Sequence, residues 1–441
     1  MEKVIGLQLA QFAVDTKYED IPREVLEYTK ALTLKTISGM VAGSVKPSGQ
    51  KMAGLIRDQR LSEEVSVMGC GFKTALWEAV FLHAYFAHAS ELEDDRFNGG
   101  VSWDITVIPL LFPLAEKLRL SGRVLMEALV LGLEVHTRTC LFNPEHLGLG
   151  AVPGAVGPAV GATRALGLGV KETAAALGLA MSGVPLAIQN FGTDAHYFES
   201  ALQSLQGMMA ADMAKIGLVG NPDIAPYLTK YLGEKRVIPE KMVEDLGRKW
   251  LICEIWIKKY PCCFLLHRQI DSVIELKQQH NFSYEEVKTI EVHASPADKI
   301  CDRPEPKIEG DLQFSFQHVL AAALLDNDVN LKHISKDALG DPRLMEARSK
   351  VKFILYPDLS SEFMGAPAHI VIKMKDGMEF SQNRAYPIGH PKEPLTTEQL
   401  RQLCAKFTKD RLPEKTISRA ADMVLNLEKL SNIKELIDIL L

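Results

Sequence analysis

Four carboxylates lie within positions 91–95, in the segment AHASELEDDRFNGG (residues 87–100), which follows an apolar run. On a continuous helix, His88, Glu91 and Asp95 would share one stripe, because they stand at i, i+3 and i+7. A helix C-terminus repels acids, so a cation or a proton must hold them there. A buried carboxyl beside a like charge has the raised pKa of a general acid or base. The segment predicts proton-transfer chemistry; a solvated, frayed helix end is the alternative.

A second candidate is the lysine pair Lys258 and Lys259 in WIKKYPCCFLLHRQIDSVIEL. Pro261 suits a first helical turn, and we expect a helix to begin there and to carry His267. Ammonium groups beside a helix N-terminus bind anions, because the free backbone N–H groups and the dipole add to their charge. The segment predicts a carboxylate-binding site; an ordinary surface lysine pair is the alternative.

A third candidate is His196 in TDAHYFES, which we expect in a loop just before a helix. An imidazole there is suited to general acid or base chemistry near neutral pH. The alternative is that Asp194 or Ser200 simply caps the helix and that His196 is exposed to solvent.

Helices must position these segments. Apolar residues at helical spacing dominate the first 250 or so residues, and abundant alanine and glycine let helix axes approach closely. Further on, VKTIEVHAS and KVKFILYP have strand character, and AHIVIKMKDGMEFSQNR predicts a hairpin turning at Asp376–Gly377. We expect a mainly α fold: a large all-helical domain over residues 1–268, a smaller α+β domain over 269–396, and a helical tail, 397–441, returning to the first.

Composition and charge exclude several functional classes. The chain has 441 residues, with 50 Lys and Arg against 56 Asp and Glu and a net charge of −6. No basic stripe suits nucleic acid, and no apolar run or basic amphipathic helix suits a membrane. The seven cysteines lack CxxC spacing and HExxH is absent, so we expect free thiols and no zinc site. The N-terminal residues lack a signal-peptide pattern, and we therefore expect a cytoplasmic protein.

Six segments in order form a larger pattern: AHASELEDD, VIPLLFPLAEKL, GPAVGATRALGL, KKYPCCFLLHRQIDSVIEL, LQFSFQHVLAAALL and HPKEPLTTEQLRQLCAKF. Their order, and above all a KxYPxCxxxHxxID-like segment, resembles the 2-methylcitrate dehydratase family (MmgE/PrpD), which includes cis-aconitate decarboxylase and iminodisuccinate epimerase. The resemblance runs over essentially the full chain. It implies a large helical domain, a smaller α/β lid domain with a cleft between them, a homodimer, and chemistry without a metal or other cofactor.

The resemblance also implies a small carboxylate as the substrate. We expect a carbon–oxygen or carbon–carbon lyase of the 2-methylcitrate dehydratase or cis-aconitate decarboxylase type, acting on a di- or tricarboxylic acid by proton transfer next to a carboxylate. An epimerase of the iminodisuccinate epimerase type is one alternative. A catalytically silent relative that serves as a binding protein is another.

Matched position by position, Glu91 stands where the family has an active-site Asp in HxxDFDD, and Lys258 matches the Lys of its KxYP segment. Other positions depart from the family pattern, so we expect a shared scaffold with a different reaction. The resemblance implies four catalytic residues, His88, Glu91, His196 and Lys258. It implies six substrate-binding residues: Asp95, Ser102, His146, Lys259, His267 and His318. Among these ten residues, Ser102 and His146 lie near positions where the family has histidines. His196 lies near a position where the family has a lysine, and His318 stands where the family has a tyrosine.

Overall fold

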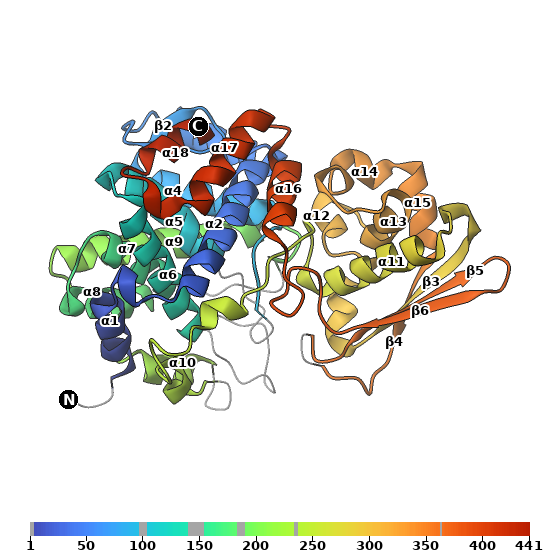
Figure 1. Cartoon of the computed structure of the whole chain (residues 1–441), viewed down its shortest axis with the longest axis horizontal. Helices are drawn as coiled ribbons and strands as arrows, with labels where there is room; N and C mark the ends of the chain where they lie inside the picture. The colour runs from blue at the N-terminus through green and yellow to red at the C-terminus, as the bar shows by residue number, and fades with distance from the viewer. Residues whose placement is uncertain (1–3, 97–103, 140–153, 183–189, 233–236, 362–363) are drawn as a thin grey trace. The chain divides into compact units, whose positions relative to one another are not determined.

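The computed structural model divides the chain into two compact units, each with its own core (Figure 1). The helical unit comprises residues 1–189, 194–257 and 396–441, and the mixed unit comprises 190–193 and 258–395. The residues that the structure describes are 4–96, 104–139, 154–182, 190–232, 237–361 and 364–441. The prediction of a mainly α fold with a small sheet in the C-terminal half is confirmed.

The helical unit is a bundle around α4 (Leu76–Ala89), which packs against α2, α5 and α9 and is buried along most of its length. A helix that is apolar nearly all round is stable only inside a core. The C-terminal helices return to this unit, because α16 and α17 both pack on α2. The other described helices are α1 (Ile5–Asp15), α2 (Arg23–Ser44), α3 (Pro47–Asp58), α5 (Asp104–Leu118), α6 (Gly122–Thr139), α7 (Val156–Ala165), α8 (Val170–Ala180), α9 (Asp194–Lys215), α10 (Ile224–Leu232), α16 (Thr397–Thr408), α17 (Glu414–Leu425) and α18 (Lys434–Leu440), with a short hairpin of β1 (Val65–Val67) and β2 (Phe72–Thr74).

The mixed unit is built on a four-stranded sheet in the order β4-β3-β5-β6. The central strand β3 (Val287–Ala294) pairs in parallel with β4 (Val351–Leu355) and antiparallel with β5 (Ala368–Met374). Strand β5 forms the predicted hairpin with β6 (Glu379–Arg384), and Gly377 in its turn has a φ of 93°, which glycine adopts without steric cost. The helices of this unit are α11 (His267–His280), α12 (Glu309–Leu312), α13 (Phe316–Asp326), α14 (Lys336–Gly340) and α15 (Pro342–Ser349).

Two predicted helix starts are wrong. Helix α9 begins at Asp194 rather than after it, because an acid in the first turn is favoured by the helix dipole. Helix α11 begins at His267 rather than at Pro261. The backbone N–H of Cys263 donates to the carbonyl of Gln313 (2.9 Å), and this tertiary bond holds the segment after the proline out of the helical path.

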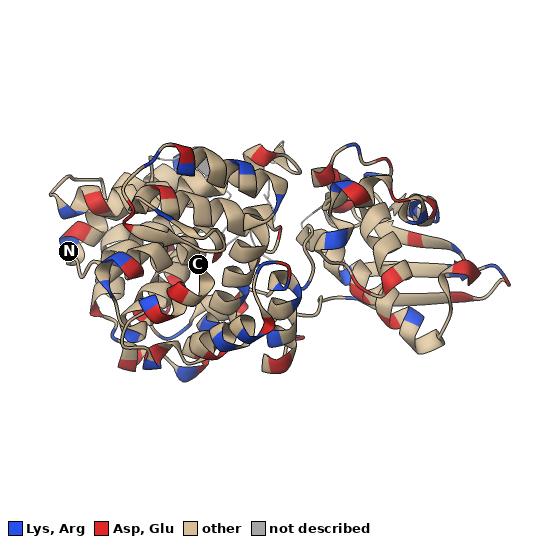
Figure 2. Cartoon of the chain, turned by 90° about the horizontal axis from the view of Figure 1, so that it is seen from above, with Lys and Arg blue, Asp and Glu red and all other residues tan. Residues whose placement is uncertain are grey.

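The surface charge follows the composition. Figure 2 shows Lys and Arg interspersed with Asp and Glu on the ribbons of both units, without a continuous basic stripe. Among the described helices, none combines the length and the apolar character needed to cross a bilayer.

Close helix packing in the core depends on glycine, and we predict a matched contrast between two helical glycines. A Cβ on Gly43 of α2 would lie 1.8 Å from the backbone oxygen of Phe86 in α4, whereas a Cβ on Gly54 of α3 would meet nothing within 4 Å. We expect Gly43→Ala to lower the free energy of unfolding by about 2–3 kcal/mol through overpacking. Gly54→Ala should raise it by about 0.5–1 kcal/mol through better helix propensity. Urea unfolding followed by circular dichroism measures both, and equal effects would contradict the packing of α2 on α4.

Candidate active site

The acidic segment after α4 is not helical. Helix α4 ends at Ala89, Ser90 follows as its C-cap, and Glu91 has a left-handed φ of 54°. The predicted single helical stripe through His88, Glu91 and Asp95 is therefore wrong. A left-handed backbone at a non-glycine residue costs about 1–3 kcal/mol, so tertiary contacts must compensate for it.

A buried lysine supplies the compensating contact. Lys35 of α2 forms an ion pair with Asp94, and its Nζ also lies 3.9 Å from the carboxylate of Asp104. Asp104 accepts hydrogen bonds from the backbone N–H of Asp94 (2.8 Å) and from the hydroxyl of Thr36 (2.5 Å). Burial raises the pKa of Asp104, and the charge of Lys35 opposes that rise. Asp94 and Asp104 therefore have a structural role, because their contacts with Lys35 anchor the turn against α2.

Beyond this anchor the chain runs extended. Asp95 forms an antiparallel bridge with Trp256, in which the N–H of Trp256 donates to the carbonyl of Asp95 (2.7 Å) and the return bond measures 3.3 Å. Arg96 makes an ion pair with Glu254 on the same pair of segments. The turn is thus fixed on both sides, by Lys35 before it and by the Trp256 segment after it.

Three predicted residues converge where this turn meets the start of α9. One ligand-type atom each from His88, Glu91 and His196 lies within 4.8 Å of the others, and the two imidazole rings are 4.0 Å apart between centroids. All three residues are buried, with relative exposures of 0%, 1% and 5%. Two imidazoles and a carboxylate in a site with little water can exchange a proton with each other or with a ligand. We call His88, Glu91 and His196 the buried trio.

Helix α9 positions the ring of His88. The hydroxyl oxygen of Ser200 lies 2.6 Å from Nδ1 of His88 and 3.1 Å from the carbonyl oxygen of Tyr197. A hydrogen bond between Ser200 and Nδ1 holds the imidazole in one orientation. Ser200 stands one helical turn after His196, so α9 delivers both residues on one face.

The surroundings of the trio are aromatic and acidic. The ring of Tyr197 lies edge-on to His88 (5.7 Å) and to Tyr85 (5.9 Å), which joins α4 to α9. Burial, and after it the nearby carboxylate of Glu91, raises the pKa of the Tyr197 phenol well above 10. The carboxylate of Glu199 lies 3.9 Å from Nδ1 of His196. The phenol therefore stays protonated, and the titratable groups of the site are the imidazoles and carboxylates.

Four other predicted residues belong to the mixed unit. Lys258 is fully buried, and Lys259 pairs with Asp271 at 3.3 Å. His267 donates from Nε2 to the carbonyl of Cys262 (3.2 Å). These contacts hold each group in a defined position, and their role in binding substrate remains a prediction.

His318 of α13 is the fourth. It donates from Nε2 to the carbonyl of His333 (2.6 Å), and burial lowers its pKa to about 4, so the imidazole is neutral. Its assignment to substrate binding, like that of Asp95, remains a prediction. Ser102 and His146 lie outside the described residues.

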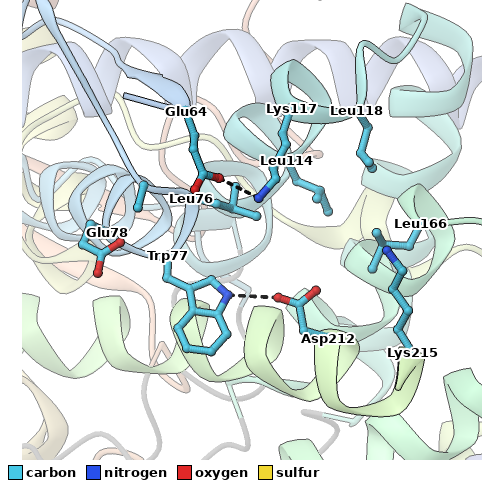
Figure 3. Close-up of a pocket in the computed structure, with 11 residues that line it drawn as sticks. Glu64, Leu76, Trp77, Glu78, Leu114, Lys117, Leu118, Leu166, Asp212 and Lys215 are labelled. Atoms are coloured by element: carbon cyan, nitrogen blue, oxygen red, sulfur yellow. Dashed lines mark hydrogen bonds and ion pairs between the residues drawn. The ribbon is translucent and has the colours of Figure 1, made fainter. Parts of the chain in front are cut away.

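A surface pocket of about 420 Å³ in the helical unit contains none of the predicted site residues (Figure 3). It lies among α4, α5 and α9, and two of its acidic side chains, Glu64 and Asp212, have hydrogen-bond partners. Lys117 pairs with Glu64 (2.6 Å), and the indole N–H of Trp77 donates to Asp212 (2.9 Å). The pocket offers no group suited to acid–base chemistry in the way that the buried trio is.

Sequence reasoning missed three residues that build the site: Lys35, Tyr197 and Ser200. Lys35 interrupts an otherwise apolar and hydroxyl-rich stretch, LTLKTIS, and a charge at such a position predicts a buried partner. The spacing of four between His196 and Ser200 was also readable, provided that the helix was placed from Asp194.

We predict that Lys35 is essential to the turn. Lys35→Met leaves Asp94 and Asp104 as buried carboxylates without their cation, and we expect the free energy of unfolding to fall by about 3–5 kcal/mol. Lys117→Met removes an ion pair whose side chains are 46% and 36% exposed, and should cost at most about 1 kcal/mol. Chemical unfolding of both variants measures the contrast. A similar small loss in both would show that the turn does not depend on Lys35.

Comparison with known proteins supports the same assignment along the whole chain. The MmgE/PrpD N-terminal domain matches residues 7–227, and the MmgE/PrpD C-terminal domain matches residues 260–429. The chain is 26% identical to a cis-aconitate decarboxylase of Mus musculus over 80% of its own length and 76% of the relative's. It is 24% identical to a cis-aconitate decarboxylase-like protein of Aspergillus oryzae over 98% of this chain and 96% of the relative. It is 25% identical to a cis-aconitate decarboxylase of Homo sapiens over 82% of this chain and 79% of the relative. The chain belongs to the MmgE/PrpD family.

Proposed function

We propose that this protein is a metal-independent lyase that acts on a small di- or tricarboxylic acid by proton transfer at a carbon next to a carboxylate. The observation that carries the proposal is the convergence of His88, Glu91 and His196 in one buried cluster. The relatives named cis-aconitate decarboxylase support the substrate class and the lyase reaction type.

The proposed chemistry needs one proton-moving group and one group that stabilises charge. In a dehydration, Glu91 or an imidazole takes the proton from carbon, the electron pair shifts toward the carboxylate, and hydroxide leaves as water after protonation. In a decarboxylation, the carbon–carbon bond to the carboxylate breaks and carbon dioxide leaves, the electron pair of that bond stays on the substrate, and a protonated imidazole or a protonated Glu91 supplies the proton that replaces the lost group. Burial favours either step where the acid or base is a carboxyl group, because burial raises the pKa of a carboxyl group toward neutrality.

A di- or tricarboxylate also needs positive partners. Lys35 is the buried lysine near the turn, but it is occupied by Asp94. We therefore keep Lys258, supported by Lys259, as the proposed carboxylate-binding group that stabilises the developing charge. Trp256, which bridges to Asp95, precedes Lys258 by two residues in the chain.

The arrangement of the trio favours a lyase over a two-base epimerase. An epimerase that uses two bases holds its carbon between them, with one base on each face. The rings of His88 and His196 are 4.0 Å apart, which leaves no room for a substrate carbon between them. An epimerase of the iminodisuccinate epimerase type would need a base other than the second imidazole on the opposite face of the carbon.

The direct test is turnover in heavy water. We expect incubation of the full chain with cis-aconitate, citrate, 2-methylcitrate and related acids to give, for at least one of them, a product or substrate with carbon-bound deuterium, detected by NMR. Glu91→Gln and His196→Asn should lower the rate by about 10²–10⁴-fold, because each removes a proton-transfer group while preserving shape.

His369→Ala serves as the control, because His369 lies on β5 of the mixed unit and is only partly buried. It should leave the rate unchanged. If no acid in the set is turned over or exchanges a proton, the chain is a silent binding protein and the lyase proposal fails.

A further inference from the structure

We propose that the buried trio is also a binding site for a divalent transition-metal ion, zinc above all, and that the bound ion inhibits the enzyme. His88, Glu91 and His196 offer two imidazole nitrogens and one carboxylate oxygen within 4.8 Å of one another. Two neutral imidazoles and a carboxylate form a ligand set typical of zinc sites that keep an open position. The inhibitory half of this inference rests on the function proposed above; the binding half does not.

The groups behind the trio orient it for a metal. Metal-bound histidines commonly donate their other ring N–H to an oxygen, which fixes the ring and its tautomer. Nδ1 of His88 lies 2.6 Å from the hydroxyl oxygen of Ser200, and this hydrogen bond orients the ring as the outer partner of a zinc-binding histidine does. The carboxylate of Glu199 lies 3.9 Å from Nδ1 of His196, which is longer than a hydrogen bond, so it must move closer to become such a partner.

Metal binding requires only a small closure. Bonds of about 2.1 Å place neighbouring ligand atoms about 3.4 Å apart in a tetrahedral zinc site. The present upper separation of 4.8 Å exceeds that by about 1.4 Å, which rotation of the Glu91 and His196 side chains can supply. The ion pair between Lys35 and Asp94 anchors the turn that contains Glu91, so the closure involves the side chains and not the backbone.

Burial and charge select the kind of ion. The three residues are buried, and a carboxylate among the ligands balances part of the charge of a divalent cation inside the core. Imidazole and carboxylate ligands favour zinc, cobalt, nickel and copper over magnesium or calcium, which prefer all-oxygen sites. A bound ion would occupy the lone pairs that the proposed proton transfer uses, and turnover would stop.

Absence of a zinc motif in the sequence is consistent with this site. His88 ends α4, Glu91 lies in the turn, and His196 stands in the first turn of α9, more than 100 residues later in the chain. No local pattern such as HExxH can encode such a set, so the proposal departs from the expectation based on motifs.

Cobalt(II) titration of the metal-free full chain, freed of any histidine tag, tests the binding half. We expect saturable visible absorption from one ion per chain, which added zinc displaces. Glu91→Gln should weaken cobalt binding by more than about 100-fold, and Ser200→Ala by about 10–100-fold, since it removes only an outer partner. His369→Ala is the matched control. This change removes a histidine from a second cluster and should leave the affinity for cobalt unchanged. In that cluster the ring centroids of His293 and His369 are 4.5 Å apart, and Nε2 of His293 lies 3.5 Å from the carboxylate of Glu291.

Several outcomes would overturn the inference. No saturable cobalt binding, binding that survives Glu91→Gln, or binding lost only in His369→Ala would each exclude the trio as the site. Circular dichroism of Glu91→Gln, which keeps the size of the side chain, excludes misfolding as the cause of a loss. Where an acid is turned over, saturating zinc should abolish the reaction and a chelator should restore it; persistent turnover would refute inhibition. Cobalt binding without turnover of any acid would refute the lyase proposal and leave the metal site standing.

Discussion

The buried ion pair between Lys35 and Asp94 is the interaction on which the site depends. It ends α4 at Ala89, because the chain must turn to bring Asp94 to the lysine, and it compensates for the left-handed backbone of Glu91. On a continuing helix, Glu91 would lie one turn beyond His88 on the same face, whereas in the structure it lies in the turn that the ion pair anchors. The charge buried in α2 therefore contributes to the position of Glu91 beside the imidazoles.

The contact between α4 and α9 is the second constraint. Tyr197 packs against Tyr85 and His88, and Ser200 binds the Nδ1 of His88, so each helix fixes the side chains of the other. Such contacts hold imidazoles in one orientation without water, which is what a proton-transfer group needs before a substrate arrives. The site is rigid because its supports are themselves core residues.

Local patterns predicted the elements well and the turn poorly. Helical spacing predicted that the first 250 or so residues form helices, and alternation located the hairpin of β5 and β6, because those signals lie within the elements themselves. The end of α4 depends on the ion pair of Asp94 with Lys35, a residue far earlier in the chain, and no window around residue 90 contains that information. The same limit explains Pro261, where a bond to the Gln313 carbonyl overrides a good helix start. The resemblance to a family identified His88, Glu91 and His196 as site residues but did not show how they lie in space. Their contact with one another follows from the tertiary structure.

A cluster of two imidazoles and one carboxylate has two uses, and the surroundings decide between them. Proton transfer needs a lone pair that is basic and accessible to a carbon acid, whereas metal binding needs the same lone pair aimed at a common centre. The contact between Ser200 and Nδ1 of His88 serves both, since it orients the imidazole ring. On the two proposals above, the proton of the carbon acid and a metal ion compete for one set of lone pairs. A relative with lysine at the position of His196 would repel the cation by charge alone, so replacing an ammonium by an imidazole opens the site to metals while keeping a group that moves protons.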